Sequence, residues 1–159
     1  NDPNIFFDDN HKRMVQNYRN AFLRLTLYHL GKGQNDLAVN TLNSMDEKLP
    51  NKLIPMDYGL LYEISNLYLR AGARDNYNRL AAEVEKQALD RLEKNPSDVQ
   101  SMYNPYRVLL DIYEGQGRND KLLEIWQKLQ SIFPDDPNVK ANIQKYRSII
   151  EGKDTSKTK

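Results

Sequence analysis

Residues 106–134 contain two amphipathic segments separated by a glycine. Apolar side chains recur at helical spacing on both sides of Gly117, and Pro134 ends the second segment. The apolar positions are Tyr106, Leu109, Leu110 and Tyr113 before the glycine, and Leu122, Trp126 and Leu129 after it. This pattern predicts a hairpin of two helices. A hairpin of this size cannot cover its own apolar face, so it also predicts neighbours of the same kind.

A glycine between two helical patterns, followed three residues later by an aspartate, occurs twice more upstream. Gly33-Gln34-Asn35-Asp36, Gly72-Ala73-Arg74-Asp75 and Gly117-Arg118-Asn119-Asp120 each follow one helical pattern and precede another. We expect each glycine to adopt the left-handed conformation that closes the first helix. We expect the following Asn or Asp oxygen to cap the second helix. The three segments therefore predict three helix-to-helix turns and an internal repeat.

The second helix of the middle hairpin is predicted to be longer than its counterparts. Pro50 and Pro134 follow Gly33 and Gly117 at the same distance, whereas Pro96 comes about two helical turns later than that distance after Gly72. Apolar positions continue in phase through Ala88, Leu89 and Leu92. We therefore predict a helix that runs to about Lys94.

The ends of the chain predict one helix each. Asp8 or Asp9 can cap a helix that ends near Gly31, and Asp136-Pro137 can start a terminal helix over 136–151. Ile5-Phe6-Phe7 is expected to be extended within segment 1–9 and to tuck under the first helix; if exposed, it marks a junction. Residues 152–159 are expected to be disordered. The core stripes are Met14, Tyr18, Phe22, Leu25 and His29 in the first helix, and Val139, Ile143, Tyr146 and Ile150 in the last.

The segment before residue 106 also carries a helix-start signal. Ser97 with Gln100 forms a capping-box pattern. Pro105 then demands a kink in that helix or a late start.

Composition describes an ordinary globular chain. Apolar residues make up 39% and charged residues 28%, and the net charge is +1, which argues against nucleic-acid binding. Zero cysteines exclude disulfides, thiol catalysis and cysteine metal sites. No apolar run is long enough to span a bilayer, and no signal peptide is visible, so we expect a soluble chain. Because it opens at Asn1 without an initiator Met, we expect an excised or processed fragment.

No catalytic constellation is visible in the sequence. His29 falls on an apolar face and is interpreted as a structural histidine, and His11 as a solvated one. Glu83, Glu85 and Glu93 lie among basic residues, which favours a solvated helix face. There is no phosphate-binding loop, nucleophile elbow or metalloprotease motif. We therefore expect no catalytic residue, no metal site and no cofactor, and interpret this fragment as a non-enzyme. The alternative is a hydrolase or transferase, which a deep pocket with convergent acid-base groups would support.

The hairpins resemble the tetratricopeptide repeat, a helix-turn-helix of about 34 residues. The matching positions are Phe22, Leu25, His29, Gly33, Ala38, Leu42, Met45 and Pro50; Leu61, Ile64, Tyr68, Gly72, Tyr77, Ala81 and Val84; and Tyr106, Leu109, Tyr113, Gly117, Leu122, Trp126, Leu129 and Pro134. Tyr77 and Leu122 depart from the small residue of the pattern. The resemblance implies an all-α, right-handed superhelical stack of antiparallel helix hairpins. It would form one domain over 10–151, with units of about 10–50, 55–96 and 97–134 and a C-terminal capping helix over 136–151.

If the hairpins stack as in that family, their first helices line a concave groove. A protein or peptide ligand is the expected partner, because amides can bond a peptide backbone while Tyr and Arg anchor side chains. The alternative is that these residues merely face solvent. The carboxylate clamp of chaperone-binding members is not reproduced, because Leu23, Leu27 and Val108 stand at positions that the clamp needs polar. The groove positions are Asn20, Leu23, Leu27, Tyr62, Glu63, Asn66, Arg70, Asn104, Arg107 and Asp111.

A weaker resemblance concerns the opening residues. Pro3-Asn4-Ile5-Phe6-Phe7-Asp8-Asp9, Arg13-Met14 and Asn17-Tyr18-Arg19-Asn20 look like the C-terminal region of an uncharacterised family of bacterial polytopic membrane proteins similar to protein O-mannosyltransferases. This likeness implies an interaction or scaffold domain attached to a bacterial membrane protein, for which we favour the periplasmic side. The alternative is an accessory module that holds an acceptor or glycan for a membrane glycosyltransferase. The oligomeric state is left open.

Overall fold

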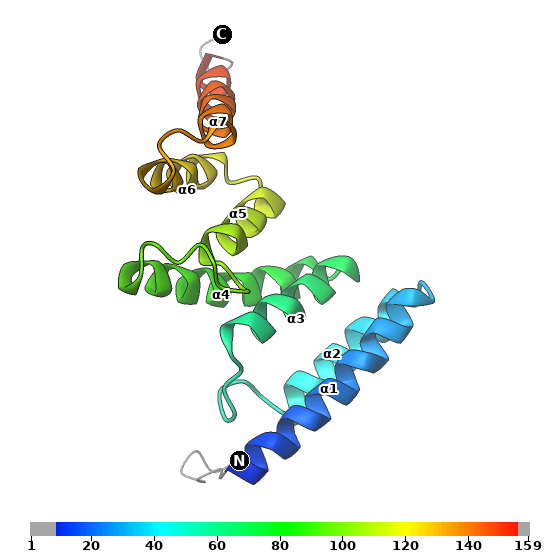
Figure 1. The fold of residues 1–159 in the computed structure, drawn as a ribbon. Coiled ribbons are helices and arrows are strands. Elements are labelled where there is room, and N and C mark those ends of the chain that lie inside the picture. The colour runs from blue at the N-terminus through cyan, green and yellow to red at the C-terminus, as the bar shows by residue number, and fades with distance from the viewer. Residues whose placement is uncertain (1–8, 156–159) are drawn as a thin grey trace. The chain divides into compact units, whose positions relative to one another are not determined.

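The computed structural model describes residues 9–155, and over this range the protein is all-α, with no strand (Figure 1). The expected fold class is confirmed to this extent. The expected extended segment lies outside the described residues, except for Asp9, which begins the first helix. The helices are α1 (Asp9–Gly31), α2 (Asn35–Lys48), α3 (Tyr58–Arg70), α4 (Arg74–Lys94), α5 (Pro105–Gln116), α6 (Asn119–Ile132) and α7 (Pro137–Thr155).

The contacts within the chain group it into two compact units, Asn1–Val84 and Glu85–Lys159. The boundary falls inside α4, so the first part of this helix belongs to unit 1 and the rest to unit 2. Arrays of helical hairpins divide readily in this way, since each hairpin contacts only its neighbours. A single domain over 10–151 stays a prediction.

The three glycine turns have nearly the same geometry. Gly33, Gly72 and Gly117 have φ values of 68°, 82° and 66°, which confirms the predicted left-handed conformation. In each turn the N–H after the glycine donates to the carbonyl four residues before the glycine, at 2.9 Å in all three cases. This is the long bond of a Schellman motif, and it explains why a residue with a Cβ would be strained at the glycine.

The predicted capping role of the acidic residues in these turns is wrong for two of them. The N-cap residues of α2 and α6 are Gln34 and Arg118, and neither makes a side-chain cap hydrogen bond. Asp36 and Asp120 lie in the first helical turn instead. There a carboxylate stabilises the helix through the positive end of its dipole.

The lengths of the second helices agree with the sequence pattern. α2 and α6 have 14 residues each and end just before Pro50 and Pro134. α4 has 21 residues and ends at Lys94, as predicted. The absence of an early proline after Gly72 therefore translates directly into two further helical turns.

Of the two outcomes that Pro105 left open for the helix signalled at Ser97, a kink or a late start, the structure shows the late start. α5 begins at Pro105, and Asn104 is its N-cap residue. The Asn104 side-chain oxygen accepts hydrogen bonds from the backbone N–H groups of Tyr106 and Arg107. Proline is favourable in the first helical turn but cannot continue an earlier helix, so the late start is the outcome that Pro105 allows.

The last helix begins as predicted and ends later. Asp136 accepts hydrogen bonds from the backbone N–H groups of Asn138 and Val139, at 2.7 and 3.2 Å, which confirms its capping role. α7 continues to Thr155, so residues 152–155 are helical instead of belonging to a disordered tail. The remaining residues of the predicted tail, 156–159, lie outside the described residues.

Side chains from the predicted repeat positions form most of the core of each unit. Tyr68 and Tyr113 are almost fully buried, and Trp126 is half-buried. The buried apolar side chains of unit 1 include Ala38, Leu42, Met45, Leu61, Ile64, Tyr68, Tyr77, Ala81 and Val84. Those of unit 2 include Ala88, Leu92, Tyr106, Leu109, Ile112, Tyr113, Leu122, Ile125, Leu129, Val139, Ile143 and Tyr146.

The core stripe predicted for α1 is wrong. Met14, Tyr18 and Leu25 are exposed, whereas the polar Arg19 and Thr26 are buried. α1 contacts α2 and α3 in unit 1, and it turns a neighbouring face toward them. The sequence pattern alone favoured the more apolar face, because it could not show that a buried arginine finds partners on the loop after α2.

Candidate functional site

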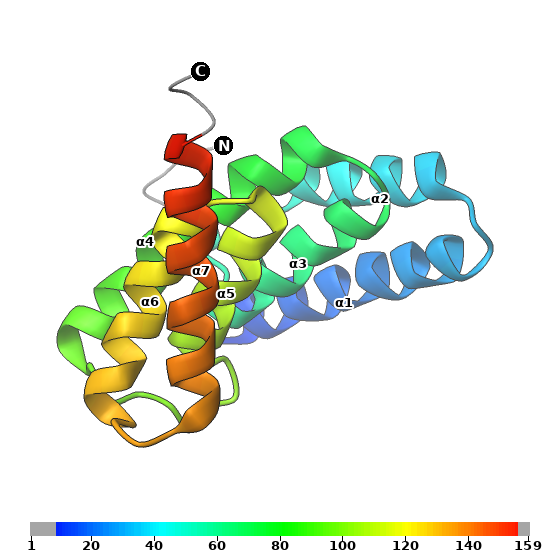
Figure 2. The same ribbon diagram turned by 90° about the horizontal axis from the view of Figure 1, so that it is seen from above.

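The groove positions predicted in unit 1 lie on α1 and α3. These two helices contact each other and run in the same direction (Figures 1 and 2). On α1, Asn20 and Leu27 are exposed and Leu23 is half-buried. Leu27 leaves 47% of its surface accessible. α1 therefore offers apolar surface at these positions, and α1 as a whole contacts α3.

The positions on α3 add polar groups to this surface. Tyr62 and Asn66 are half-buried, while Glu63 and Arg70 are exposed. They share one side of α3, since positions separated by three or four residues lie on the same face of a helix. Leu61, Ile64 and Tyr68 occupy the other side and are buried. We refer to Leu23, Leu27, Tyr62, Asn66 and Arg70 as the α1/α3 surface.

The three groove positions of unit 2 are the N-cap residue of α5 and two residues of its first half and middle. Arg107 and Asp111 are exposed. Asn104 has a structural role, because its oxygen caps α5 and its amide nitrogen donates to the carbonyl of Val99 at 2.9 Å. A ligand at Asn104 would have to compete with these bonds. The structure therefore places the predicted positions on exposed or half-buried sides of α1, α3 and α5, and gives Asn104 a capping role.

A polar network in unit 1 was not predicted. The Tyr68 hydroxyl donates to the side-chain oxygen of Asn43 on α2, at 2.9 Å. The Asn76 amide donates to the same oxygen at 3.2 Å. Burial, with the nearby Asp46 carboxylate, raises the pKa of Tyr68 to about 12. The network joins α2, α3 and the first turn of α4 within the unit.

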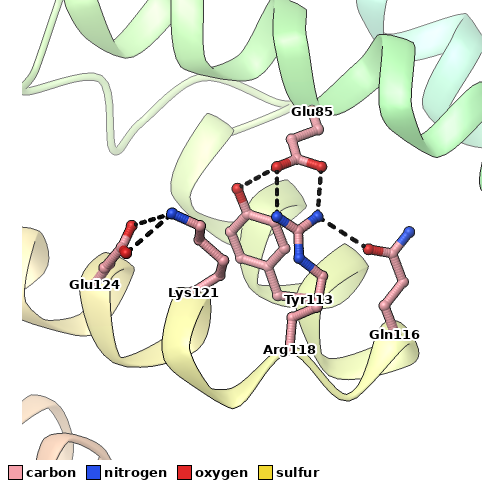
Figure 3. A network of polar contacts seen from close by, with 6 residues as sticks. All are labelled: Glu85, Tyr113, Gln116, Arg118, Lys121 and Glu124. Atoms are coloured by element: carbon pink, nitrogen blue, oxygen red, sulfur yellow. Dashed lines mark hydrogen bonds and ion pairs between the residues drawn. The ribbon is translucent and has the colours of Figure 1, made fainter.

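A stronger network in unit 2 ties α4 to the turn between α5 and α6 (Figure 3). The guanidinium of Arg118 donates to both oxygens of Glu85, at 2.7 and 3.1 Å. The Tyr113 hydroxyl donates to Glu85 at 2.9 Å, and Arg118 also stacks over the Tyr113 ring. The solvated helix face predicted for Glu85 is therefore wrong, because its side chain is only 18% exposed and accepts from both partners.

The hydrogen bonds of the Glu85 network keep Tyr113 neutral and Arg118 charged. Burial and the hydrogen bond to Glu85 raise the pKa of Tyr113, so the phenol remains a donor. The hydrogen bond to Glu85 raises the pKa of Arg118, which keeps the guanidinium charged. Figure 3 shows the three side chains pointing toward one another, with Gln116 beside Arg118. Groups engaged in this way stabilise the unit and are poorly suited to exchanging protons with a substrate.

Arg19 forms the third buried polar feature. Its side chain is 2% exposed and donates to the backbone carbonyls of Leu49 and Ile54, on either side of the turn at Pro50. Burial lowers the pKa of Arg19. Both hydrogen bonds are donated by the same terminal nitrogen, Nη2, whereas the buried Nε has no hydrogen-bond partner among the described residues. Arg19 thus fixes the loop between α2 and α3 from within α1.

Unit 2 contains a cavity of about 430 Å³ near the end of α4. Leu89, Leu92 and Ile132 supply much of its apolar lining, with Glu93 and Lys128 as its charged members. Tyr106 also lines it and donates its hydroxyl to the carbonyl of Pro96 at 2.6 Å. The cavity joins side chains from α4, α5 and α6, so no single stretch of sequence carries a signal for it.

Raising the pH is expected to weaken unit 1 through Tyr68. A raised pKa means that the fold favours the neutral phenol, so its contribution is complete below pH of about 10 and is lost as pH rises toward 12. Urea unfolding of the wild type and of Tyr68→Phe should show the wild type more stable at neutral pH, by roughly 1 kcal/mol. The gap should shrink above pH of about 10; a constant gap would contradict the assignment.

The described residues offer few other groups suited to catalysis or metal binding. His29 is half-buried and lies 2.8 Å from the Gln34 side-chain oxygen, consistent with a structural histidine. Between residues 9 and 155 there is no group of three His, Asp or Glu side chains that could hold a metal ion. Nor does any helix described there have the length and apolarity needed to cross a membrane. No protein-family model matches the chain, and no curated protein sequence matches it.

Proposed function

We propose that the protein is a tetratricopeptide-like array whose hairpins stack as a right-handed superhelix. Three observations support this: the shared bonding of the glycine turns, the equal lengths of α2 and α6, and the parallel contact of α1 with α3. Two of the hairpins also share the residue that stands four positions before the glycine. Tyr68 and Tyr113 occupy that place, and each donates its hydroxyl to the preceding helix.

The proposed function is recognition of a partner protein through an extended peptide segment on the α1/α3 surface. The observation that carries it is the exposure of Leu27 and partial exposure of Leu23 beside a helix that presents Tyr62 and Asn66. Leucine and tyrosine can hold an apolar side chain, and the Asn66 amide can bond a peptide backbone. Arg70 supplies a positive charge at the end of α3, so the preferred peptide would be apolar with an acidic residue.

The test is a peptide array followed by titration of the best binder. Leu27→Asp and Tyr62→Ala are each expected to weaken binding by about tenfold or more, because both remove central apolar contacts. Leu25→Asp is the matched control, since Leu25 and Leu27 are 46% and 47% exposed on the same helix. They point about 200° apart, so only Leu27 belongs to the proposed surface. Equal losses in Leu25→Asp and Leu27→Asp, or no saturable peptide, would refute the proposal.

The accessory module of a membrane glycosyltransferase, attached to a bacterial membrane protein, is the alternative proposal. It would use the same surface, because tyrosine and amide side chains also suit sugars. Titration with oligosaccharides in place of peptides separates the two proposals. Saturable sugar binding that Tyr62→Ala abolishes would favour the glycan-binding module.

A further inference from the structure

α1, together with Lys32 just after it, carries a stripe that stays exposed while the helix contacts α2 and α3. Seven positions follow one another at alternating spacings of three and four residues, and all seven are exposed. This spacing is the seam of a coiled coil. The positions are His11, Met14, Tyr18, Ala21, Leu25, Tyr28 and Lys32. We refer to the five central ones, from Met14 to Tyr28, as the α1 seam.

In the other two hairpins, the residues at the positions equivalent to Leu25 and Tyr28 are buried. Leu25 and Tyr28 precede Gly33 at the distances at which Ile64 and Leu67 precede Gly72. Ile64 and Leu67 are buried in unit 1, where α3 contacts α2. Leu109 and Ile112 precede Gly117 in the same way and are buried in unit 2. The α1 seam is therefore the kind of helix face that another helix covers elsewhere in this protein.

We propose that a second copy of the chain covers the α1 seam, in a symmetric dimer of antiparallel α1 helices. The seam is self-complementary in that arrangement. With Ala21 at the twofold axis, Met14 falls opposite Tyr28 of the second copy. Tyr18 then falls within one residue of its Leu25. A two-fold interface must use the same patch on both chains, and the small side chain of Ala21 permits close approach at the axis.

Charge permits this occupant, and area limits how tightly it binds. Between Met14 and Tyr28, Arg24 is the exposed charged residue beside the seam, and the antiparallel register sets it opposite Tyr18 and next to Asn17 of the second copy, without like-charge repulsion. Tyr18 and Tyr28 are 57% and 59% exposed, and Met14 and Leu25 about half. Four such side chains offer roughly 400 Å² per chain. Twice that area, roughly 800 Å², lies below the range of stable specific interfaces and within that of weak, transient ones, so the dimer should be weak and concentration-dependent.

Sedimentation equilibrium of the full chain over a wide range of concentrations tests the dimer. The wild type should sediment as a monomer–dimer equilibrium. Leu25→Asp should raise the dissociation constant by about tenfold or more, because it places a charge in the seam. Leu27→Asp, equally exposed on the same helix but outside the seam, should leave the constant unchanged. Circular dichroism of both variants checks that the helices remain.

Engineered cysteines test the orientation of the helices, and the natural chain contains none to interfere. Ala21→Cys should form a disulfide-linked dimer on oxidation, since the two copies meet at this residue. Met14→Cys and Tyr28→Cys should each fail alone and cross-link when the two proteins are mixed. A parallel pair would instead cross-link each single variant with itself.

A wild type that stays monomeric at all concentrations would overturn the proposal, and the seam would then be covered by another segment or partner. Cross-linking of Met14→Cys or Tyr28→Cys alone would also overturn it. None of these measurements involves a peptide ligand. The experiments can therefore show that the dimer does not form while peptide binding at the α1/α3 surface holds. They can equally show that the dimer forms while peptide binding fails.

Discussion

Replacing Arg19 by alanine is expected to lower the free energy of unfolding by about 4 kcal/mol. The substitution removes the donors that satisfy the carbonyls of Leu49 and Ile54, and it leaves a cavity where a fully buried side chain stood. Removing a buried charge offsets part of this loss. The net effect remains large because buried acceptors without a partner are costly.

Urea unfolding followed by circular dichroism measures the effect of Arg19→Ala, with Arg24→Ala as the control. Arg24 is an exposed arginine on the same helix, and its loss should change stability by no more than about 0.5 kcal/mol. Arg19→Lys should restore stability only in part, since its Nζ can donate to two carbonyls but reaches one bond less far than the Nη2 atom that makes both contacts. Hydrogen exchange should accelerate at residues 49–54 in Arg19→Ala. A loss below about 1 kcal/mol would show that Arg19 does not hold this loop.

Replacing Glu85 by alanine is expected to cost about 3 kcal/mol, the second largest effect. The change leaves the Arg118 guanidinium and the Tyr113 hydroxyl without their shared acceptor. The expected loss lies at the lower end for a buried pair, because the Arg118 side chain is 36% exposed and water can reach it. Glu85→Gln should be intermediate, since it keeps an acceptor and loses the charge.

The ion pair between Arg79 and Asp46 provides the matched control for Glu85. Its closest atoms are 3.0 Å apart, but the two side chains are 55% and 37% exposed. Asp46→Ala should therefore cost less than about 1 kcal/mol. A double-mutant cycle of Glu85→Ala with Tyr113→Phe should give a coupling energy above about 0.5 kcal/mol. Similar losses for Asp46→Ala and Glu85→Ala would mean that burial does not strengthen the Glu85 network.

The candidate site was predicted only in part by sequence reasoning. Helical spacing was enough to find the exposed sides of α3 and α5, since Glu63, Arg70, Arg107 and Asp111 are exposed as expected. The same spacing could not show that Asn104 caps α5, because this depends on where Pro105 lets the helix begin. The role of Glu85 was also missed. Its partners are far away in the sequence, and no local pattern distinguishes a paired carboxylate from a solvated one.

The sequence by itself determined the local structure of this protein. Gly33, Gly72 and Gly117 set three turns through their backbone freedom, and Pro50 and Pro134 set where α2 and α6 stop. These outcomes depend on residues within a few positions, so pattern and steric rules suffice. Tertiary structure decided which face of α1 is buried. Two carbonyls of a distant loop accept hydrogen bonds from Arg19 there. Met14, Tyr18 and Leu25 are left in solvent, because burial depends on the partners that packing supplies.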